Sequence, residues 1–311
     1  MCGHLLQILR LHRNQGQLSP MAQQWAGKTF GDGWLLRWLI HSLRFMDVRF
    51  LYVFAYIFVV PVCIAVNHSR KTSWFFYRKV LGFGWWKSLW GVYANHCLFA
   101  EVIIDKFAMF AGRKFKVEVV GDEKYQEYAA RPEGFIQLSS HIGNYEIAGY
   151  TLVCKDKCIN PVLYGGEGVQ VMENRGNMFG RTNIKMIRML PDMAYLFEID
   201  EALNRGEVVS FAADRFMGGA RHIALDFFGR KAEFPQGPFS VATMRGLDVL
   251  AINVMKTGWV SYKIFVTPLE YDKQASRKEQ IRQLSGAYVA ELEKMLRAYP
   301  HQWFNFYEFW N

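Results

Sequence analysis

The stretch FIQLSSHIGNYEIAGY, from Phe135 to Tyr150, decides how the chain around it folds. Its first residues form an apolar run that fits a buried strand, and its last residues fit the start of an apolar helix. Between them, Gly143 allows an unusual backbone angle and Asn144 is a good helix N-cap. The stretch therefore predicts a strand, a tight turn and a helix, with His141 at the carboxyl end of the strand.

His141 and Glu146 form the polar pair of this turn. Five residues of continuous α-helix leave two side chains roughly 140° apart, so the two cannot share a face if both are helical. They can meet if His141 precedes the helix. We therefore expect the Glu146 carboxylate to reach one imidazole nitrogen, which leaves the other as a base for a hydroxyl or an amine. A capping histidine beside a surface glutamate is the alternative that the spacing leaves open.

Strands and helices alternate after about Lys114. Apolar runs predict strands at Lys116–Val120, Gly134–Leu138, Asn160–Tyr164, Glu207–Ala212, His222–Phe228, Val249–Val254 and Val260–Thr267. Helical spacing predicts helices at Tyr145–Cys154, Tyr195–Arg205, Phe239–Arg245 and Lys278–Ala298. This order predicts an α/β fold with a mixed, largely parallel sheet flanked by helices. Ligands bind beyond the carboxyl strand ends of such sheets, where we expect both His141 and Asp214. A turn cap is the alternative for Asp214.

The first third of the chain has a different composition. Residues 1–33 are polar and are expected to be a leader, with Met21 as an alternative start. Residues 34–113 are expected to be a helical, membrane-anchoring region that precedes an α/β domain at 114–311. Leu51 to Val66 carries no charge over sixteen residues. That is about 24 Å of helix against a hydrocarbon core of about 30 Å, so it predicts a marginal transmembrane helix or one that lies in the interface.

The aromatic segment from Trp74 to Trp90 contains Arg78, Lys79 and Lys87. Such a mixture is typical of a segment that docks at a membrane surface, because aromatic rings are apolar while the indole of Trp and the phenol of Tyr can still form a hydrogen bond. A helical hairpin buried against the main domain is the alternative. Either interpretation makes this part of the chain helical.

Composition limits the partners. The net charge is +9 and 51% of the residues are hydrophobic, which excludes a disordered chain and favours anionic partners such as lipid headgroups or an acidic carrier protein. Nucleic acid is not expected, because the sequence has no basic run, zinc-finger spacing or RNA-binding motif. The five scattered cysteines favour a reducing compartment. No motif requires a metal or a cofactor.

Two blocks of the sequence resemble one family. The segment SSHIGNYEIAG resembles the His-x4-Asp/Glu motif of the lysophospholipid acyltransferase superfamily, in the version of the lipid A biosynthesis (lauroyl/myristoyl) acyltransferases. A second block, Val208 to Val254, is similar to the family's Asp-containing strand end, Phe-Phe-Gly turn and Pro-x-Gly-Pro helix start, at Asp214–Arg215, Phe227–Gly229 and Pro235–Pro238. The resemblance covers most of the chain from about Ala22.

The resemblance implies a membrane-associated acyltransferase on the cytoplasmic face of a bacterial inner membrane. Its donor would be acyl carrier protein or acyl-CoA, and its acceptor a lipid or glycolipid. His141 would be the base and Glu146 its orienter. The substrate-binding positions would be Gly143, Asn144, Asp214 and Arg215, with Arg175, Arg181 and Arg188 as candidates for an arginine that binds an anionic group. Ala213–Arg215 stands where the family more often has Asp-Gln-Asp, which suggests a differently charged acceptor pocket.

Two other functions compete with acyl transfer. A lipid esterase or thioesterase could use Ser139 or Ser140, but the sequence lacks a Gly-x-Ser-x-Gly elbow. A non-enzymatic membrane-binding protein would explain the aromatic residues and the charge. It would leave His141, Glu146 and Asp214 without a shared purpose.

Overall fold

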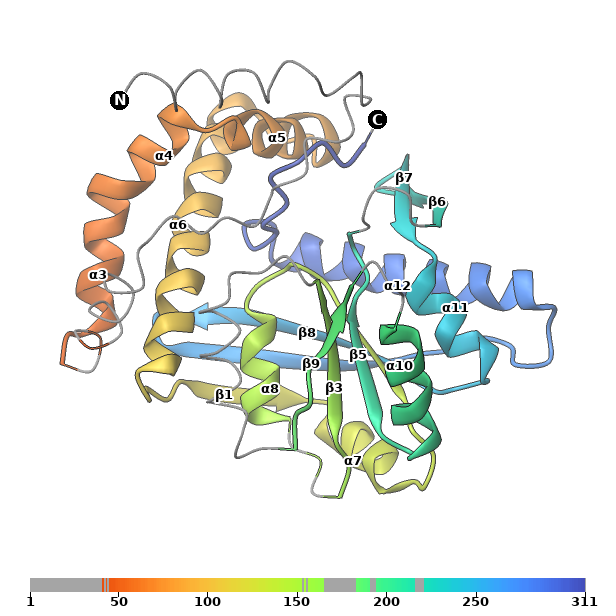
Figure 1. Ribbon diagram of the computed structural model, residues 1–311. Coiled ribbons are helices and arrows are strands. Elements are labelled where there is room, and N and C mark those ends of the chain that lie inside the picture. The colour runs from red at the N-terminus through yellow and green to blue at the C-terminus, as the bar shows by residue number, and fades with distance from the viewer. Residues whose placement is uncertain are drawn as a thin grey trace, which may run out of the picture.

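A computed structural model describes His41, Leu43 and residues 45–152, 154, 156–164, 183–190, 194–215 and 221–310 (Figure 1). The helices are α3 (Val48–Phe54), the π-helix η2 (Ala55–Val59), α4 (Val60–Val66), α5 (Ser69–Phe75), the π-helix η3 (Phe76–Val80), α6 (Trp85–Phe110), α7 (Asp122–Ala130), the 3-10 helix η4 (Tyr145–Ile147), α8 (Ala148–Thr151), α10 (Tyr195–Asn204), α11 (Gly237–Met244) and α12 (Arg277–Ala298). The strands are β1 (Lys116–Val120), β2 (Ile136–Ser139), β3 (Ile159–Tyr164), β4 (Ile187–Met189), β5 (Val208–Ala212), β6 (His222–Phe227), β7 (Arg230–Pro235), β8 (Val249–Gly258) and β9 (Ser261–Leu269).

Seven of these strands form one sheet in the order β1-β9-β8-β2-β5-β3-β4. β8 and β9 pair antiparallel, and the other neighbours in this sheet pair parallel. β6 and β7 form a separate antiparallel pair. The predicted α/β fold with a mixed, largely parallel sheet is therefore confirmed. β2 lies next to β5 with Ser139 opposite Ala212, so the segments that follow these two strands leave the sheet side by side.

Each face of the sheet has its own hydrophobic core, because successive residues of a strand point to opposite faces. On β8, Val249, Ala251 and Met255 belong to the core that includes residues of α10, α11 and α12. Leu250 and Ile252, with Val254, belong to the core that contains Tyr125 of α7 and Ile147 of η4. β8 is buried from residue 249 to residue 256, as expected for a central strand covered on both faces.

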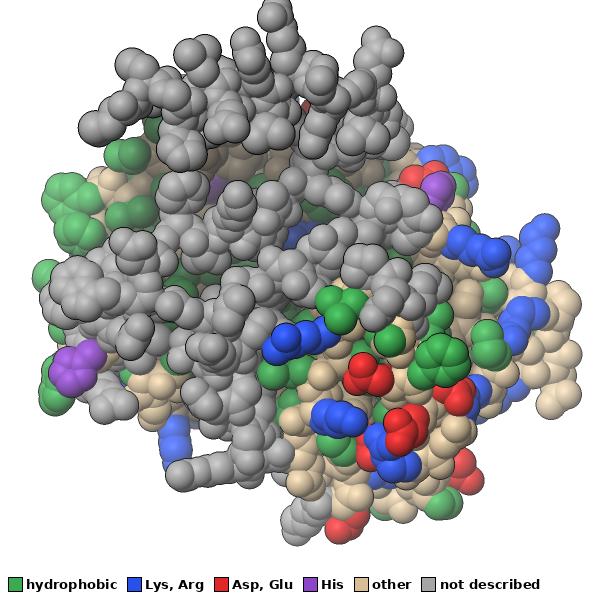
Figure 2. Space-filling model, viewed as in Figure 1, with side chains coloured by type: hydrophobic (Ala, Val, Ile, Leu, Met, Phe, Trp, Pro, Cys, Tyr) green, Lys and Arg blue, Asp and Glu red, His purple; other side chains and the backbone are tan. Residues whose placement is uncertain are grey.

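α3, η2 and α4 make one apolar helix, Val48–Val66, of 19 residues with a mean hydropathy of 2.2. By length and composition it could cross a membrane, and it is the one helix of this kind among the residues that the structure describes. One side packs on α6, and the other side exposes Phe50, Phe54, Ile57, Phe58, Val62 and Val66. Figure 2 shows hydrophobic side chains along the left edge, where Figure 1 places α3 and α4. The predicted helical, apolar N-terminal region is present.

Several elements differ from the sequence prediction. The helix expected over Tyr145–Cys154 is a 3-10 turn followed by α8, which ends at Thr151 because Leu152 is extended. β8 runs on to Gly258 instead of ending at Val254, since Lys256 is buried within the protein rather than exposed at a strand end. Three elements, α7, β4 and β7, were not predicted, because they are short or lack an apolar run. α11 begins at Gly237, with Pro238 in its first turn, where a proline costs no hydrogen bond.

Candidate active site

His141 and Asp214 meet at the carboxyl end of the sheet. Each lies two residues beyond a member of the Ser139–Ala212 pair that closes the β2–β5 ladder. The Nδ1 atom of His141 lies 2.7 Å from Oδ1 of Asp214, and the backbone N–H of His141 donates to Oδ2 at 2.8 Å. Both carboxylate oxygens therefore bind one residue, which fixes the orientation of the imidazole and leaves Nε2 as its second nitrogen.

The two side chains differ in exposure. The side chain of His141 is 27% exposed and that of Asp214 is 1% exposed. Burial would raise the pKa of Asp214, but the interaction with His141, its two hydrogen bonds and the nearby Arg215 charge outweigh burial and lower that pKa below the usual value. Asp214 is therefore a carboxylate at neutral pH, able to stabilise a positive charge on the imidazole.

Tyr288 of α12 supports the pair from inside the core. Its hydroxyl donates to the carbonyl of Ser139 at 3.0 Å and lies 2.6 Å from the hydroxyl of Ser140. Burial, followed by the negative charge of Asp214, raises the pKa of Tyr288 well above its usual value. Tyr288 therefore stays a neutral donor that holds the backbone just before His141. Tyr145 makes an edge contact with the imidazole, at 5.7 Å between ring centroids.

The turn after His141 is pinned to β8. Gly143 has a φ of +56°, and a Cβ on it would lie 1.8 Å from the carbonyl oxygen of Val254, so only glycine fits. The backbone N–H of Asn144 donates to that same Val254 carbonyl at 2.9 Å. The N–H of Gly143 donates to the carbonyl of Gln302 at 2.8 Å. The turn that carries His141 is thus fixed on one side by the sheet and on the other by the C-terminal segment.

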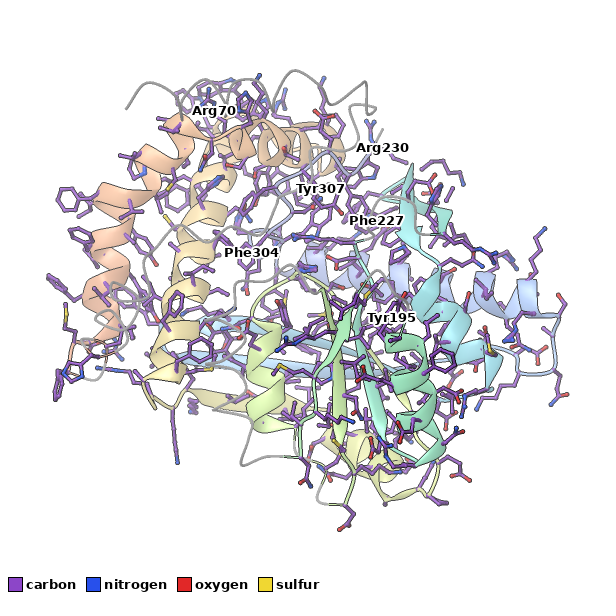
Figure 3. All side chains as sticks on the ribbon, viewed as in Figure 1. Arg70, Tyr195, Phe227, Arg230, Phe304 and Tyr307 are labelled. Atoms are coloured by element: carbon purple, nitrogen blue, oxygen red, sulfur yellow. The ribbon has the colours of Figure 1, made fainter. Side chains whose placement is uncertain are left out.

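That C-terminal segment completes the site (Figure 3). The N–H of Phe304 donates to the carbonyl of His141 at 3.2 Å, and the hydroxyl of Tyr307 donates to the carbonyl of Asp214 at 3.3 Å. Nη2 of Arg215 donates to the carbonyl of Phe304 at 2.6 Å. These contacts were not predicted from the sequence. The only signal was the aromatic run YPHQWFNFYEFW near the C-terminus, in which an apolar segment contains few charges.

Glu146 was expected to bind the imidazole of His141, but it binds Lys106 instead. Its carboxylate pairs with Nζ of Lys106 on α6 at 2.6 Å, and Asp214 holds Nδ1 of His141 instead. The physical reason is the path of the turn. Gly143 and Asn144 are bound to β8 before η4 begins, and the turn therefore carries Glu146 toward α6. The ion pair is mostly buried, with the Glu146 side chain 7% exposed.

The other expected site residues lie in different surroundings. Gly143 and Asn144 are buried, which favours a role in shaping the turn, and their binding of substrate stays a prediction. Arg215 is partly buried beside Asp214, with its guanidinium 5.5 Å from the ring centroid of Tyr307. Arg188 is exposed on β4, at the edge of the sheet. Arg175 and Arg181 lie outside the described residues.

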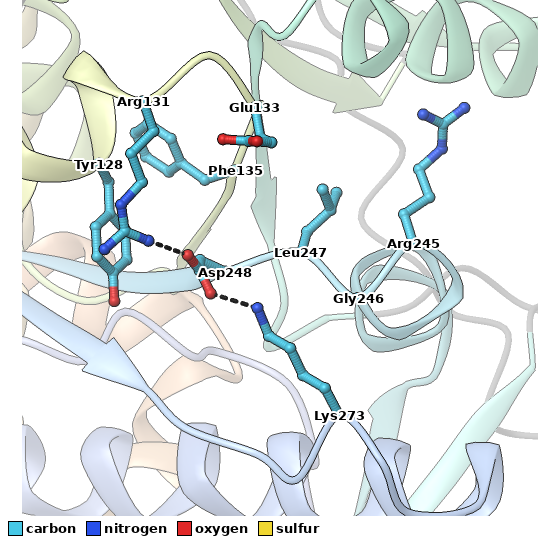
Figure 4. A pocket seen from close by; sticks show the side chains of 10 residues that line it. Tyr128, Arg131, Glu133, Phe135, Arg245, Gly246, Leu247, Asp248 and Lys273 are labelled. Atoms are coloured by element: carbon cyan, nitrogen blue, oxygen red, sulfur yellow. Dashed lines mark hydrogen bonds and ion pairs between the residues drawn. The ribbon is translucent and has the colours of Figure 1, made fainter.

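A cavity of about 210 Å³ lies at the opposite end of the sheet (Figure 4). Its lining includes the residues just before β2 and β8, whereas His141 follows β2. Arg131 and Lys273 both pair with Asp248 there, and Arg245 pairs with Asp200. The cations of its wall are thus paired with carboxylates, and the cavity is separate from the His141–Asp214 pair.

Comparison with known proteins adds a family to this geometry. A model of the family described as bacterial lipid A biosynthesis acyltransferase matches residues 101–311, a range that contains His141, Glu146 and Asp214. The crystal structure of the 1-acyl-sn-glycerophosphate (LPA) acyltransferase PlsC from Thermotoga maritima is similar over 83% of this chain and 100% of that one, at 14% identity and a TM-score of 0.37. A likeness at that score carries no weight for fold or substrate. No curated protein matches the chain.

Proposed function

The chain belongs to the bacterial lipid A biosynthesis acyltransferase family, and we propose that it moves a fatty acyl group from a thioester to a hydroxyl or amine of a lipid or glycolipid acceptor. The resemblance of its two sequence blocks already pointed to this family. The observation that supports the proposed chemistry most is the His141–Asp214 pair, because it leaves the second nitrogen of a partly exposed imidazole as a general base, within the range that matches the family.

Nε2 of His141 takes the proton of the acceptor hydroxyl or amine as that group attacks the thioester carbonyl. A neutral nucleophile of this kind is weak, and an adjacent base activates it without any covalent intermediate on the enzyme. Asp214 keeps the Nδ1 proton in place and stabilises the imidazolium that forms, at 2.7 Å. This is the role that the sequence analysis gave to Glu146.

The tetrahedral intermediate then collapses. The carbon–sulfur bond breaks, the thiol leaves, and the imidazolium returns its proton to the sulfur. The acceptor gains an ester or an amide, the donor becomes a free thiol, and His141 is again neutral. The step needs no cofactor, since the thioester supplies the activated acyl group.

Acyl carrier protein or CoA would be the donor. An acidic carrier protein suits a chain of net charge +9, because complementary charge speeds encounter and orients the two partners. Both donors are cytoplasmic thioesters, so we place the site on the cytoplasmic face of the inner membrane. Arg215, beside the pair, is the described cation best placed to meet an anionic group of a substrate.

We further propose that the helix Val48–Val66 lies in the membrane interface and does not cross the bilayer alone. The hydroxyls of Tyr52 and Tyr56 donate to Asp105 and Glu101 of α6, so one face of the helix is bound to polar groups of the protein. The opposite face exposes phenylalanine and branched aliphatic side chains. A helix with one polar, protein-bound face and one apolar face is typical of an interfacial anchor.

The test is acyl transfer by the purified full-length chain in detergent. The probes are acyl carrier protein and CoA, each loaded with saturated fatty acyl chains of several lengths and offered with a total bacterial inner-membrane lipid extract. Mass spectrometry of the lipids names the acceptor class and the chain. The His141→Ala protein should fold and show no transfer. Transfer at the native rate by that variant would refute the proposal, and free fatty acid without acylated lipid would identify a hydrolase.

A further inference from the structure

A buried ionic cluster lies behind the turn that carries His141. Its centre is Lys256 of β8, whose side chain is 2% exposed. Nζ of Lys256 pairs with Asp105 and, at 2.9 Å, with Glu101, both on α6. We call Tyr52, Glu101, Asp105, Lys256 and Tyr262 the Lys256 cluster. None of these residues takes part in the chemistry proposed above.

Asp105 is the most connected member of the cluster. One of its oxygens accepts a hydrogen bond from Tyr52 of α3, and the other accepts from Lys256 and from Tyr262 of β9. Breaking a buried and hydrogen-bonded charge pair is costly, because the remaining charge has no water to replace its partner. The cluster therefore fixes three elements rigidly: the apolar helix, α6 and the β8–β9 pair.

The cluster reaches the His141 turn through Asn144. Nδ2 of Asn144 donates to the hydroxyl of Tyr262 at 3.4 Å, and that hydroxyl donates a hydrogen bond to Asp105. Burial, and then the charge of Asp105, raises the pKa of Tyr262 well above its usual value, so the hydroxyl keeps its proton and can serve both partners. The amide of a residue three positions after His141 is thus oriented from α6.

A second link runs through Gln302. Its side-chain oxygen accepts from the N–H of Lys256 and its side-chain nitrogen donates to the Lys256 carbonyl, both at 2.8 Å. The carbonyl of the same Gln302 accepts from the N–H of Gly143. On α6, Lys106 follows Asp105 directly and pairs with Glu146. Positions 143, 144 and 146 of the motif are therefore all held by groups bound to, or next to, the Lys256 cluster.

We propose that Tyr262 and Asp105 are positioning residues for acyl transfer, which hold Asn144 and through it the turn that aims Nε2 of His141 at the acceptor. The proposal rests on the function proposed for His141. Neither residue contacts the reacting atoms: Tyr262 acts through Asn144, and Asp105 acts through Tyr262. General-base catalysis depends strongly on this aim, since a misplacement of about 1 Å can cost about a hundredfold in rate.

The experiment compares Tyr262→Phe, Asn144→Ala and the double variant in the full-length chain, using the transfer assay and probes described above. Tyr262→Phe removes one oxygen and keeps the ring, and Asn144→Ala removes the other end of the same hydrogen bond. We expect each to lower kcat by about ten- to a hundredfold with KM within about twofold. The double variant should be no worse than the worse single variant, because both act through one contact.

Tyr125→Phe is the matched control. Tyr125 is fully buried in the same core as Tyr262, and its hydroxyl accepts hydrogen bonds from Gln137 and Cys154 but from no residue of the His141 turn. The phenylalanine variant loses those two hydrogen bonds. It should lose stability with little change in kcat. A kcat for Tyr262→Phe no lower than that of Tyr125→Phe would overturn the proposal, and so would additive losses in the double variant.

Asn144→Ala keeps the test open if Tyr262→Phe fails to fold, because it leaves the Lys256 cluster intact. A native kcat in a folded Asn144→Ala protein would overturn the proposal as well. His141→Ala separates this result from the parent proposal. If that variant is inactive while Tyr262→Phe and Asn144→Ala are native-like, only the positioning role falls.

Discussion

Replacing Asp214 by asparagine should slow acyl transfer by orders of magnitude without unfolding the protein. In the native site both carboxylate oxygens accept, one from the backbone N–H of His141 at 2.8 Å and one from Nδ1 at 2.7 Å. An asparagine has the same shape but offers one acceptor and one donor. The backbone N–H of His141 can only donate, so it stays hydrogen-bonded to the side-chain oxygen of the asparagine. The amide nitrogen then faces Nδ1, which must accept.

That exchange moves the imidazole proton to Nε2, the nitrogen that has to take the acceptor proton. A catalytic histidine held in the wrong tautomer loses about 10⁴ in kcat where the carboxylate of a comparable pair has been replaced. We expect a loss of about 10³ to 10⁴, which at 1.36 kcal/mol per tenfold corresponds to about 4 to 5.5 kcal/mol of transition-state stabilisation. Since the acyl donor and the lipid acceptor can still bind, KM for each substrate should change little.

The measurement is the initial rate of thiol release from acyl-CoA or acyl carrier protein, with the inner-membrane lipid extract as acceptor. Glu146→Gln is the comparison, because Glu146 pairs with Lys106 and not with the imidazole. It should cost less than Asp214→Asn. If Asp214→Asn keeps more than a tenth of the native kcat while Glu146→Gln loses activity by a thousandfold, the orienting carboxylate is Glu146 and our assignment is wrong.

Three further predictions concern stability and membrane binding. The pKa of Asp214 is lowered in the folded protein, so its stabilisation is present above about pH 4 and is lost as pH falls through the folded pKa. Tm should therefore drop more between about pH 6 and pH 3 in the native protein than in Asp214→Asn, and equal drops would contradict this. Gly143→Ala should lower the free energy of unfolding by at least about 1–2 kcal/mol, because alanine is strained in the left-handed backbone conformation, and by more because its Cβ would overlap with β8. Urea unfolding measures this loss, and native stability would disprove the turn geometry. Replacing exposed Phe54 and Phe58 together by Asp should lower the affinity for anionic lipid vesicles about a hundredfold or more, since each apolar side chain contributes about 1.5–3 kcal/mol on burial. Co-sedimentation with the vesicles measures this affinity. Phe197→Asp, at a still more exposed position on α10, should bind vesicles as the native chain does, and an equal loss there would remove the assignment of the membrane face.

Local patterns of the sequence determined much of the fold. The strand predicted at Lys116–Val120 is β1 with the same bounds, and the helix predicted at Lys278–Ala298 is α12 to within one residue. Both follow from the spacing of apolar side chains, which a chain carries wherever it is placed. The fold class, the family and the position of His141 after a strand were readable for the same reason. So was the position of Asp214 after another strand.

The tertiary structure alone decided which of these residues meet. Asp214 lies 73 residues after His141 and reaches it because β2 and β5 are neighbours in register, a fact of sheet order that no local pattern contains. Glu146 is five residues from His141, yet it pairs with α6 because the turn is bound to β8 first. Lys256 lies beyond the strand predicted at Val249–Val254, yet it is buried within β8 because two carboxylates of α6 pair with it. The sequence by itself places these side chains at the correct edge of the sheet. Which partners they bind is decided only when the elements pack, because a charge that becomes buried must then be paired.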